Sequence, residues 1–285
     1  MSSSYIQTRR KIADYLATLV AAGLSVIVVG ALVAIFAYLV LKGAGSLNWA
    51  FLTQTPKPVG EAGGGMANAL LGSVIILSIA SLFGVPVGIA AGIYLAEYGR
   101  NSFGKVVRFT ADVLNGVPSI VIGLVAYGLV VIGQRHFSAF AGGVALAIMM
   151  VPVVTRATEE MLLLVPQSVR EAAFGLGIPQ WRTTVSITLA TARSGIITGV
   201  MLAFARVAGE TAPLLFTAFG NQFWSFSPNQ PIAALPLQIF TYAISPFDEW
   251  HRQAWAGALV LVALIVGTIA VVRILFQRGM LGEAR

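Results

Sequence analysis

The chain has 285 residues, of which 57% are hydrophobic and only 10% are charged, and its formal net charge is +7. Soluble domains carry roughly a quarter charged residues, so this composition excludes a water-soluble globular protein. The lack of cysteine excludes disulfides and thiolate chemistry, and the two histidines, His136 and His251, lie too far apart to suggest a metal site. A positive balance in a membrane protein reflects cytoplasmic loops more often than nucleic-acid binding. We therefore predict no metal, no cofactor and no nucleic-acid partner.

Six stretches are free of Asp, Glu, Lys and Arg: 15–41, 62–96, 113–134, 136–155, 211–247 and 253–272. Each is long enough to cross a hydrocarbon core, which takes about 20 helical residues. The short alternating segments of a β-barrel are missing. We predict an all-α membrane protein with about six transmembrane helices, near 16–41, 67–96, 110–133, 137–155, 185–218 and 253–276. The fifth is too long for a simple crossing, and we expect it to break near Gly209 or Pro213.

The distribution of positive charge predicts the orientation. With the N-terminus inside, thirteen of the eighteen Lys and Arg residues fall on the cytoplasmic side and four on the outer side, while Arg206 remains within the membrane. Cytoplasmic loops carry the excess of Lys and Arg. We therefore predict cytoplasmic N- and C-termini and a multi-pass protein of the bacterial plasma (inner) membrane.

The domain organisation follows from these spans. Residues 1–66 are predicted to form an N-terminal cytoplasmic segment, an anchor helix and an outer loop. Residues 67–276 are predicted to form the transmembrane module, with a cytoplasmic segment at 156–184, and 277–285 a cytoplasmic tail. The glycine-rich run 60–65 lacks the Lys-Ser/Thr of a phosphate-binding P-loop, so we interpret it as a linker. No Walker A sequence occurs in the chain, which predicts that it does not hydrolyse ATP and is not an enzyme.

The cytoplasmic segment contains EAAFGLGIPQWRTTVSITLA, residues 171–190. This stretch resembles the signature loop of bacterial ABC importer permeases, in which Glu-Ala-Ala is followed by Gly and then by Ile-x-Leu-Pro. The matching positions are Glu171, Ala172, Ala173, Gly177, Ile187 and Leu189, whereas Ala190 replaces the usual proline. The alternative is an ordinary amphipathic loop.

The resemblance implies a MetI-like ABC importer permease fold. It also implies that a short coupling helix at Glu171, Ala172 and Ala173 docks on a separate ATPase subunit and ends at a turn at Gly177. Glycine permits such a turn. Arg170 and Glu171 are expected to offer charged contacts at the rim of this docking surface.

A second stretch, RVAGETAPLLFTA at 206–218, places an arginine inside the membrane. Arg206 lies about 20 Å along a helix from Arg193, since each residue adds ~1.5 Å. An arginine at such depth costs ~2.5–3.5 kcal/mol on insertion scales. Glu210 is four residues further on, so we expect the two side chains to pair. Such a pair indicates a substrate pathway or proton relay; a structural bridge is the alternative.

This stretch, with VPSIVIG at 117–123, resembles the permease subunits of high-affinity phosphate importers. The resemblance implies that Arg206 contributes to phosphate passage, with Glu210 as its partner and Thr211 beside the path. We also hypothesise that Glu210 accepts the proton of hydrogen phosphate, which sulfate lacks.

The implied partners are a second related permease, two ATP-binding subunits at the cytoplasmic face, an extracytoplasmic phosphate-binding protein and membrane lipid. Three alternatives remain open: a permease for another oxyanion such as sulfate or molybdate, a secondary transporter, and a non-transporting scaffold. Other charges suggest structural roles. Arg108 and Asp112 are expected to pair with each other, and Glu159 and Glu160 to form a solvated face.

Overall fold

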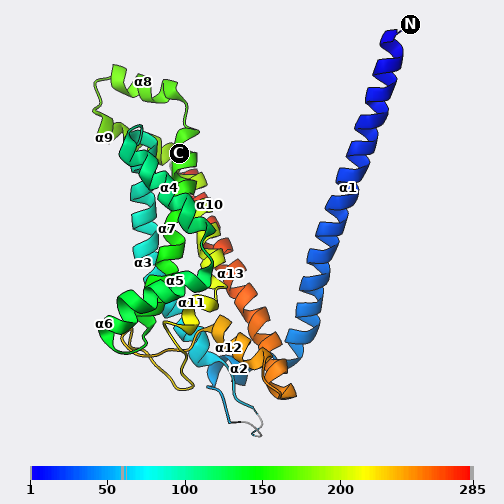
Figure 1. Ribbon diagram of the computed structural model, residues 1–285, viewed down its shortest axis with the longest axis vertical. Coiled ribbons are helices and arrows are strands. Elements are labelled where there is room, and N and C mark those ends of the chain that lie inside the picture. The colour runs from blue at the N-terminus through cyan, green and yellow to red at the C-terminus, as the bar shows by residue number, and fades with distance from the viewer. Residues whose placement is uncertain (1, 59–60, 62, 283–285) are drawn as a thin grey trace.

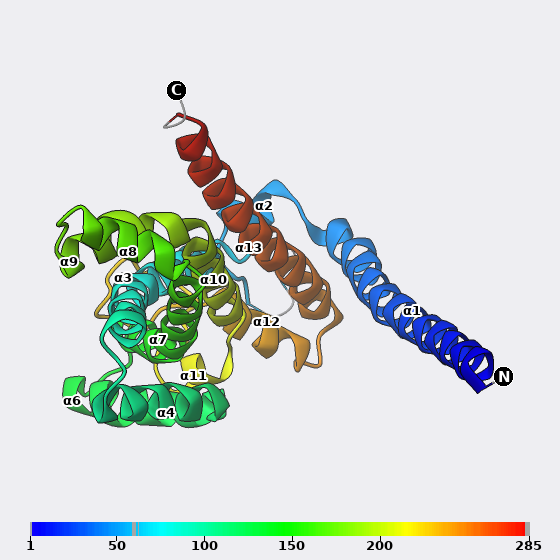
Figure 2. The same ribbon diagram turned by 90° about the horizontal axis from the view of Figure 1, so that it is seen from above.

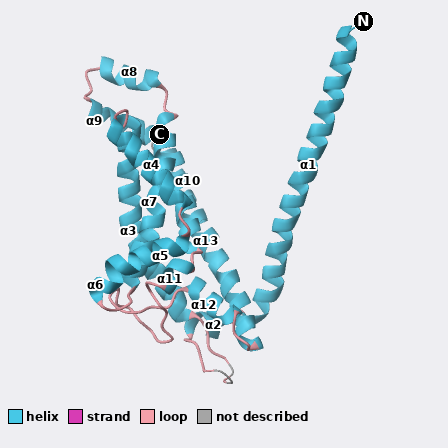
Figure 3. Ribbon diagram, viewed as in Figure 1, coloured by secondary structure: helices cyan, strands magenta, loops and turns pink. Residues whose placement is uncertain are grey.

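A computed structural model describes residues 2–58, 61 and 63–282. The described residues are predominantly helical (Figure 3), and their only β-type pairing is an isolated bridge between Phe219 and Ile232. The long helices are α1 (Ser2–Gly43), α3 (Ala67–Glu97), α7 (Ala139–Leu163), α10 (Leu189–Ala208) and α13 (Asp248–Gly282). The shorter elements are η1 (Ala44–Ser46), α2 (Trp49–Thr53), α4 (Ser102–Gly116), α5 (Ser119–Ala126), η2 (Tyr127–Val131), α6 (Ile132–Gln134), α8 (Gln167–Gly175), α9 (Gln180–Thr183), η3 (Thr184–Thr188), α11 (Ala212–Leu215) and α12 (Leu235–Ala243).

Within the described residues, five helical segments are long and apolar enough to cross a membrane, and a bent pair makes a sixth candidate. This confirms the predicted all-α membrane fold with about six spans. Part of the glycine-rich run 60–65 and the last three residues of the predicted tail lie outside the described residues.

The predicted single helix 110–133 is wrong. The chain instead forms α4 and α5, which meet at an angle of 108°. Pro118 precedes α5, and Val117 before it is extended, with ψ of 131°. A proline disfavours the helical conformation in the residue before it, so helix α4 must end there and the chain turns sharply.

Helices α3 and α7 share the most extensive helix–helix contact among the described residues. Gly84, Gly88 and Gly92 recur every four residues on α3 and therefore lie on one face. A Cβ at Gly88 would approach the Cβ of Val154 to 2.6 Å, and one at Gly92 would approach that of Thr158 to 2.5 Å. Small residues at this spacing let two membrane helices pack backbone to backbone.

Helix α1 stands apart from the bundle over most of its length (Figures 1 and 2). It reaches α13 only near its end, where Leu39 is buried, Gly43 abuts Trp255 and Leu259, and Tyr38 meets Trp255 edge to face. The start of α1 and the end of α13 lie at the same end of the bundle as α8 (Figure 1).

The fifth predicted span is broken where the sequence suggested. The chain enters it through α9 and the π-helical turn η3, continues as α10, and leaves the helix at Gly209 before the short α11, which contains Pro213. The fourth predicted span, 137–155, continues two turns further to Leu163. The first third of the predicted coupling segment 156–184 is therefore still part of α7.

Candidate coupling segment and substrate path

Helix α8 forms an arm at one end of the molecule (Figure 1). It starts after Pro166 and ends before Gly177, whose φ of +76° places it in the left-handed region that favours glycine. Of the signature residues, Glu171 and Ala172 are exposed, whereas Ala173 is buried. The predicted short helix with a glycine turn is thus present, and it presents one alanine outward and one inward.

Exposed apolar side chains lie on α8 and in the segments on either side of it. Four are strongly exposed: Leu164 (73%), Phe174 (45%), Leu176 (81%) and Trp181 (64%). Exposed apolar groups of this size gathered at one end of a protein mark an interaction site. The small side chain of Ala172, which is exposed on the same helix, leaves room for another surface to approach closely.

Arg170 differs from the prediction that it lies at the rim, because its side chain is only 12% exposed. Its guanidinium lies 3.0 Å from Oε1 of Glu97, the last residue of α3, and donates to the carbonyls of Leu162 at 2.8 Å and Val165 at 2.6 Å. These carbonyls belong to the last turn of α7 and the link that follows. The end of a helix leaves carbonyls without partners and carries partial negative charge, so a guanidinium there is well satisfied.

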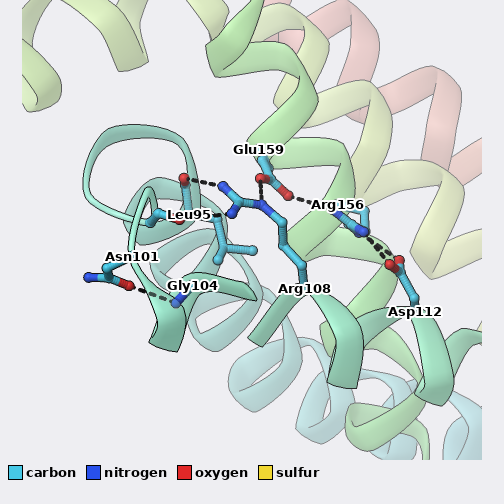
Figure 4. A network of polar contacts seen from close by, with 8 residues as sticks. Leu95, Asn101, Gly104, Arg108, Asp112, Arg156 and Glu159 are labelled. Atoms are coloured by element: carbon cyan, nitrogen blue, oxygen red, sulfur yellow. Dashed lines mark hydrogen bonds and ion pairs between the residues drawn. The ribbon is translucent and has the colours of Figure 1, made fainter. Parts of the chain in front are cut away.

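A second partly buried arginine, Arg108, lies on α4 (Figure 4). Arg108 donates its Nε to Glu159 of α7. Its terminal nitrogens donate at 2.8 Å to the carbonyl of Leu95, in the last turn of α3, and to that of Gly99, just beyond the helix. Glu159 is 3% exposed. A buried carboxylate requires paired charge, so the prediction that Glu159 belongs to a solvated face is wrong.

Arg156 of α7 completes this network (Figure 4). It donates to the second oxygen of Glu159 at 2.8 Å and binds the carboxylate of Asp112 through two nitrogens. Arg108 and Asp112 therefore pair with α7 and not with each other. The i, i+4 spacing on α4 led to the prediction of a local pair, whereas the partners of Arg108 and Asp112 lie 44 to 51 residues away in the chain.

Arg206, Glu210 and Thr211 lie around the break between α10 and α11. Arg206 is exposed on the last turn of α10, and its side chain has no hydrogen bond or ion pair to the part of the chain that the structure describes. The expected pair with Glu210 is not formed. Helix α10 ends at Ala208, so Glu210 lies beyond it and does not share its face. Glu210 and Thr211 are half-buried.

Arg206 continues a polar stripe along α10. Thr191, Ser194 and Thr198 are exposed at spacings of three and four residues and hence share one face with Leu202 and Arg206. The hydroxyls of Thr191 and Thr198 donate to carbonyls four residues earlier, those of Ile187 and Ser194 respectively. The stripe is thus compatible with a membrane but is more polar than a lipid-facing surface.

The two stretches that suggested a phosphate permease meet in space. Helix α5, from the segment 117–123, packs on α11, from the segment 206–218. A Cβ at Gly123 would come within 2.6 Å of the Cα of Pro213. This close approach fixes the broken end of the fifth span against the bent third span. As for metals, no group of three or more His, Cys, Asp or Glu residues suited to a metal ion occurs among the described residues.

The architecture is that of an ABC importer permease. It resembles an inward-facing MetNI methionine ABC transporter structure with a TM-score of 0.60 at 16% identity, over 75% of this chain and 96% of that one. An amino acid ABC transporter structure matches with a TM-score of 0.52 at 20% identity, over 73% and 92%. At these identities the likeness concerns the fold.

The sequence family follows from a separate comparison. Residues 84–280 match the family described as binding-protein-dependent transport system inner membrane component. The chain belongs to this family, and it is therefore a multi-pass inner-membrane permease component and not a catalytic subunit.

Its relatives within the family are phosphate permeases. The phosphate transport system permease protein PstA of Yersinia pestis is 50% identical over 84% of this chain and 81% of its own length. That of Haemophilus influenzae is 49% identical over 84% and 85%, and that of Mycobacterium leprae is 43% identical over 73% and 69%.

Proposed function

We propose that this chain is the transmembrane permease subunit of an ATP-driven importer of inorganic phosphate. The observation that carries this proposal is the likeness to PstA permeases, which extends over more than four fifths of both chains for the Yersinia pestis protein. ATP hydrolysis is assigned to separate subunits, since the chain has no Walker A sequence.

In this proposal α8 docks on an ATP-binding subunit through Glu171, Ala172 and the apolar side chains around them. Ala173 packs inward, and Gly177 ends the helix. The complex contains two such ATP-binding subunits, a second related permease and an extracytoplasmic phosphate-binding protein. Lipid covers the remaining apolar surface, including most of α1.

The proposed substrate path passes Arg206, Glu210 and Thr211. Arg206 supports it because an exposed guanidinium without a partner is costly in lipid. It must therefore face water, substrate or the second permease. A guanidinium offers paired donors to phosphate and keeps its charge. Broken membrane helices occur where backbone lines a cavity or substrate site, and the gap between α10 and α11 is such a break.

The proposal is tested by reconstituting the chain in proteoliposomes with its permease partner, ATP-binding subunit and binding protein. We expect phosphate to stimulate ATP hydrolysis and to accumulate in an ATP-dependent way that survives a protonophore. Equal stimulation by sulfate or molybdate indicates an importer for another oxyanion. Uptake without ATP that collapses with the protonophore indicates a secondary transporter. Either result overturns the proposal.

A further inference from the structure

A cavity of about 200 Å³ lies between α10 and α13. Helix α10 contributes Arg193, Ser194 and Thr198 to its lining, and α13 contributes Arg273. The rest of the lining is apolar and includes Ile197. The described residues that line the cavity therefore carry two guanidinium groups and no carboxylate, which gives the cavity a positive charge.

The position of Arg273 on α13 places this cavity at the α8 end of the molecule. Arg252 and Arg273 bracket the charge-free stretch 253–272, which is long enough to cross a hydrocarbon core of ~30 Å. Arg252 lies near the start of α13, on the outer side, and the end of α13 lies with α8 (Figure 1). Arg273 is thus at headgroup level on the predicted cytoplasmic side.

Three other arginines at this end are neutralised within the bundle. Arg108, Arg156 and Arg170 each bind a carboxylate. Arg273 differs from them, because it is exposed and its side chain has no hydrogen bond or ion pair to the described residues. Positive charge on the cytoplasmic side is general among membrane proteins, but here guanidiniums from two helices line one cavity. A cleft lined by one sign of charge concentrates ions of the opposite sign.

The donors of the cavity match a phosphate group. A guanidinium presents paired N–H donors to phosphate oxygens and keeps its charge. Ser194 adds a hydroxyl that is exposed and makes no hydrogen bond to the described residues. Ser194 and Thr198 also belong to the polar stripe of α10, and Arg193 lies about 20 Å along this helix from Arg206. The cavity therefore continues the stripe at its α8 end.

We propose that the cavity between α10 and α13 binds a phosphate group, held by the guanidiniums of Arg193 and Arg273 and by the hydroxyl of Ser194. Two sources carry this chemistry. One is inorganic phosphate at the α8 end of the proposed substrate path, and this source rests on the proposed function. The other is the headgroup of an anionic phospholipid, whose acyl chains would contact the apolar part of the lining.

The test follows a cysteine inside the cavity, since the chain has none of its own. Ile197→Cys is purified with the partner permease and ATP-binding subunits in dodecyl maltoside free of phospholipid, and its reaction with N-ethylmaleimide is followed by the mass of this chain. We expect inorganic phosphate or phosphatidylglycerol to slow the reaction, and potassium chloride at equal ionic strength to leave it unchanged. Slowing by inorganic phosphate assigns the site to the substrate, and slowing by phosphatidylglycerol alone assigns it to lipid. Slowing by neither overturns the proposal.

Substitution of Arg273 ties this protection to the cavity. We expect Arg273→Gln to raise the ligand concentration for half-maximal protection by about tenfold or more, because hydrogen bonds to charged groups are strong enough for such a factor. Arg273→Lys keeps the charge but loses the paired donors, so we expect an intermediate shift. Arg273 is exposed, and we expect both variants to melt at the temperature of the unchanged chain.

The matched control for these variants is Arg100→Gln at the same end. Arg100 is exposed and no described residue pairs with its side chain, so we expect protection of Ile197→Cys to be unchanged in this background. Unchanged protection in Arg273→Gln overturns the proposal.

Failure of this site and failure of the proposed function are separate results. Protection is measured without ATP and without transport, whereas the proposed function is tested by ATP-dependent uptake. A complex that imports phosphate but shows no protection of Ile197→Cys retains the proposed function and lacks the site. A complex that imports another oxyanion but is protected by phosphatidylglycerol loses the proposed function and keeps the site.

Discussion

Helices α3 and α10 both cross the proposed membrane and both pack glycines against α7, yet their exposed side chains differ. Helix α3 turns a row of glycines toward α7 and buries them, while most of its exposed side chains, such as Leu82 and Val87, are apolar. Helix α10 exposes hydroxyls and Arg206, and it ends in a break. The comparison indicates that α3 belongs to the scaffold and that α10 borders the path that the substrate takes.

The first test of this difference disturbs the face of α3 that packs on α7. Gly88→Leu forces a side chain against Val154, and overpacking of this kind costs about 3 kcal/mol. We expect the purified variant to lose most of its folded yield and to melt at clearly lower temperature in detergent. Gly23→Leu on α1 is the control, since a Cβ at Gly23 meets no described atom within 4 Å. Equal melting temperatures for both variants contradict the scaffold role.

The buried charge network gives the next effect. Glu159→Ala leaves Arg108 and Arg156, both partly exposed, without their shared carboxylate, and the loss of hydrogen bonds to a charged group costs about 1.5–3 kcal/mol. We expect a lower denaturation midpoint for this variant. The neighbouring Glu160 is exposed, so Glu160→Ala should change the midpoint little. Equal denaturation midpoints for Glu159→Ala and Glu160→Ala would contradict a stabilising role of the network.

On α10 the expected effect is on transport and not on folding. Arg206→Gln keeps the length of a polar side chain but removes the charge, and we expect phosphate uptake to fall at least about tenfold, or ~1.4 kcal/mol of barrier, at unchanged thermal stability. Arg252→Gln is the control, because Arg252 belongs to an exposed ion pair with Glu249, which contributes little. An unchanged rate of phosphate uptake in Arg206→Gln would contradict a place for Arg206 on the substrate path.

The smallest effect is expected at Glu210. The side chains of Glu210 and Arg206 do not pair in this structure. We therefore expect Glu210→Gln to be as stable as the unchanged chain and to differ from Arg206→Gln in phosphate uptake. If Glu210 accepts the proton of hydrogen phosphate, the variant lowers the preference for phosphate over sulfate in competitive uptake. Unchanged rate and unchanged preference in that assay eliminate the hypothesis.

Much of the fold could be predicted because charge-free stretches and helix-breaking residues act locally. The limits of α3 and the break at Gly209 follow from such signals. The sequence also contains the cause of the bend at Val117, since Pro118 disfavours the helical conformation in the residue before it. The charge-free stretch around Pro118 nevertheless led to the prediction of one straight helix. Apolar composition alone does not distinguish one straight span from two segments at 108°.

Only part of the candidate site could be predicted from the sequence. Glu171, Ala172 and Gly177 could be found because the signature loop is a short local pattern. The partners of Arg108, Arg170 and Glu159 could not, because they are set by how α3 and α7 pack, with contacts across 44 to 73 residues. The Arg206–Glu210 pair was expected from helical spacing, and it fails because the helix ends between the two residues.

The most direct test of the difference between α3 and α10 uses two leucines of equal exposure, Leu82 at 69% and Leu202 at 68%. Each is replaced by cysteine in the otherwise cysteine-free chain, and labelling by a membrane-impermeant, charged thiol reagent is measured in the reconstituted complex. We predict that Leu202→Cys on α10 reacts and that phosphate slows the reaction, whereas Leu82→Cys on α3 stays unlabelled in lipid. Equal labelling at both positions would contradict a water-filled path along α10.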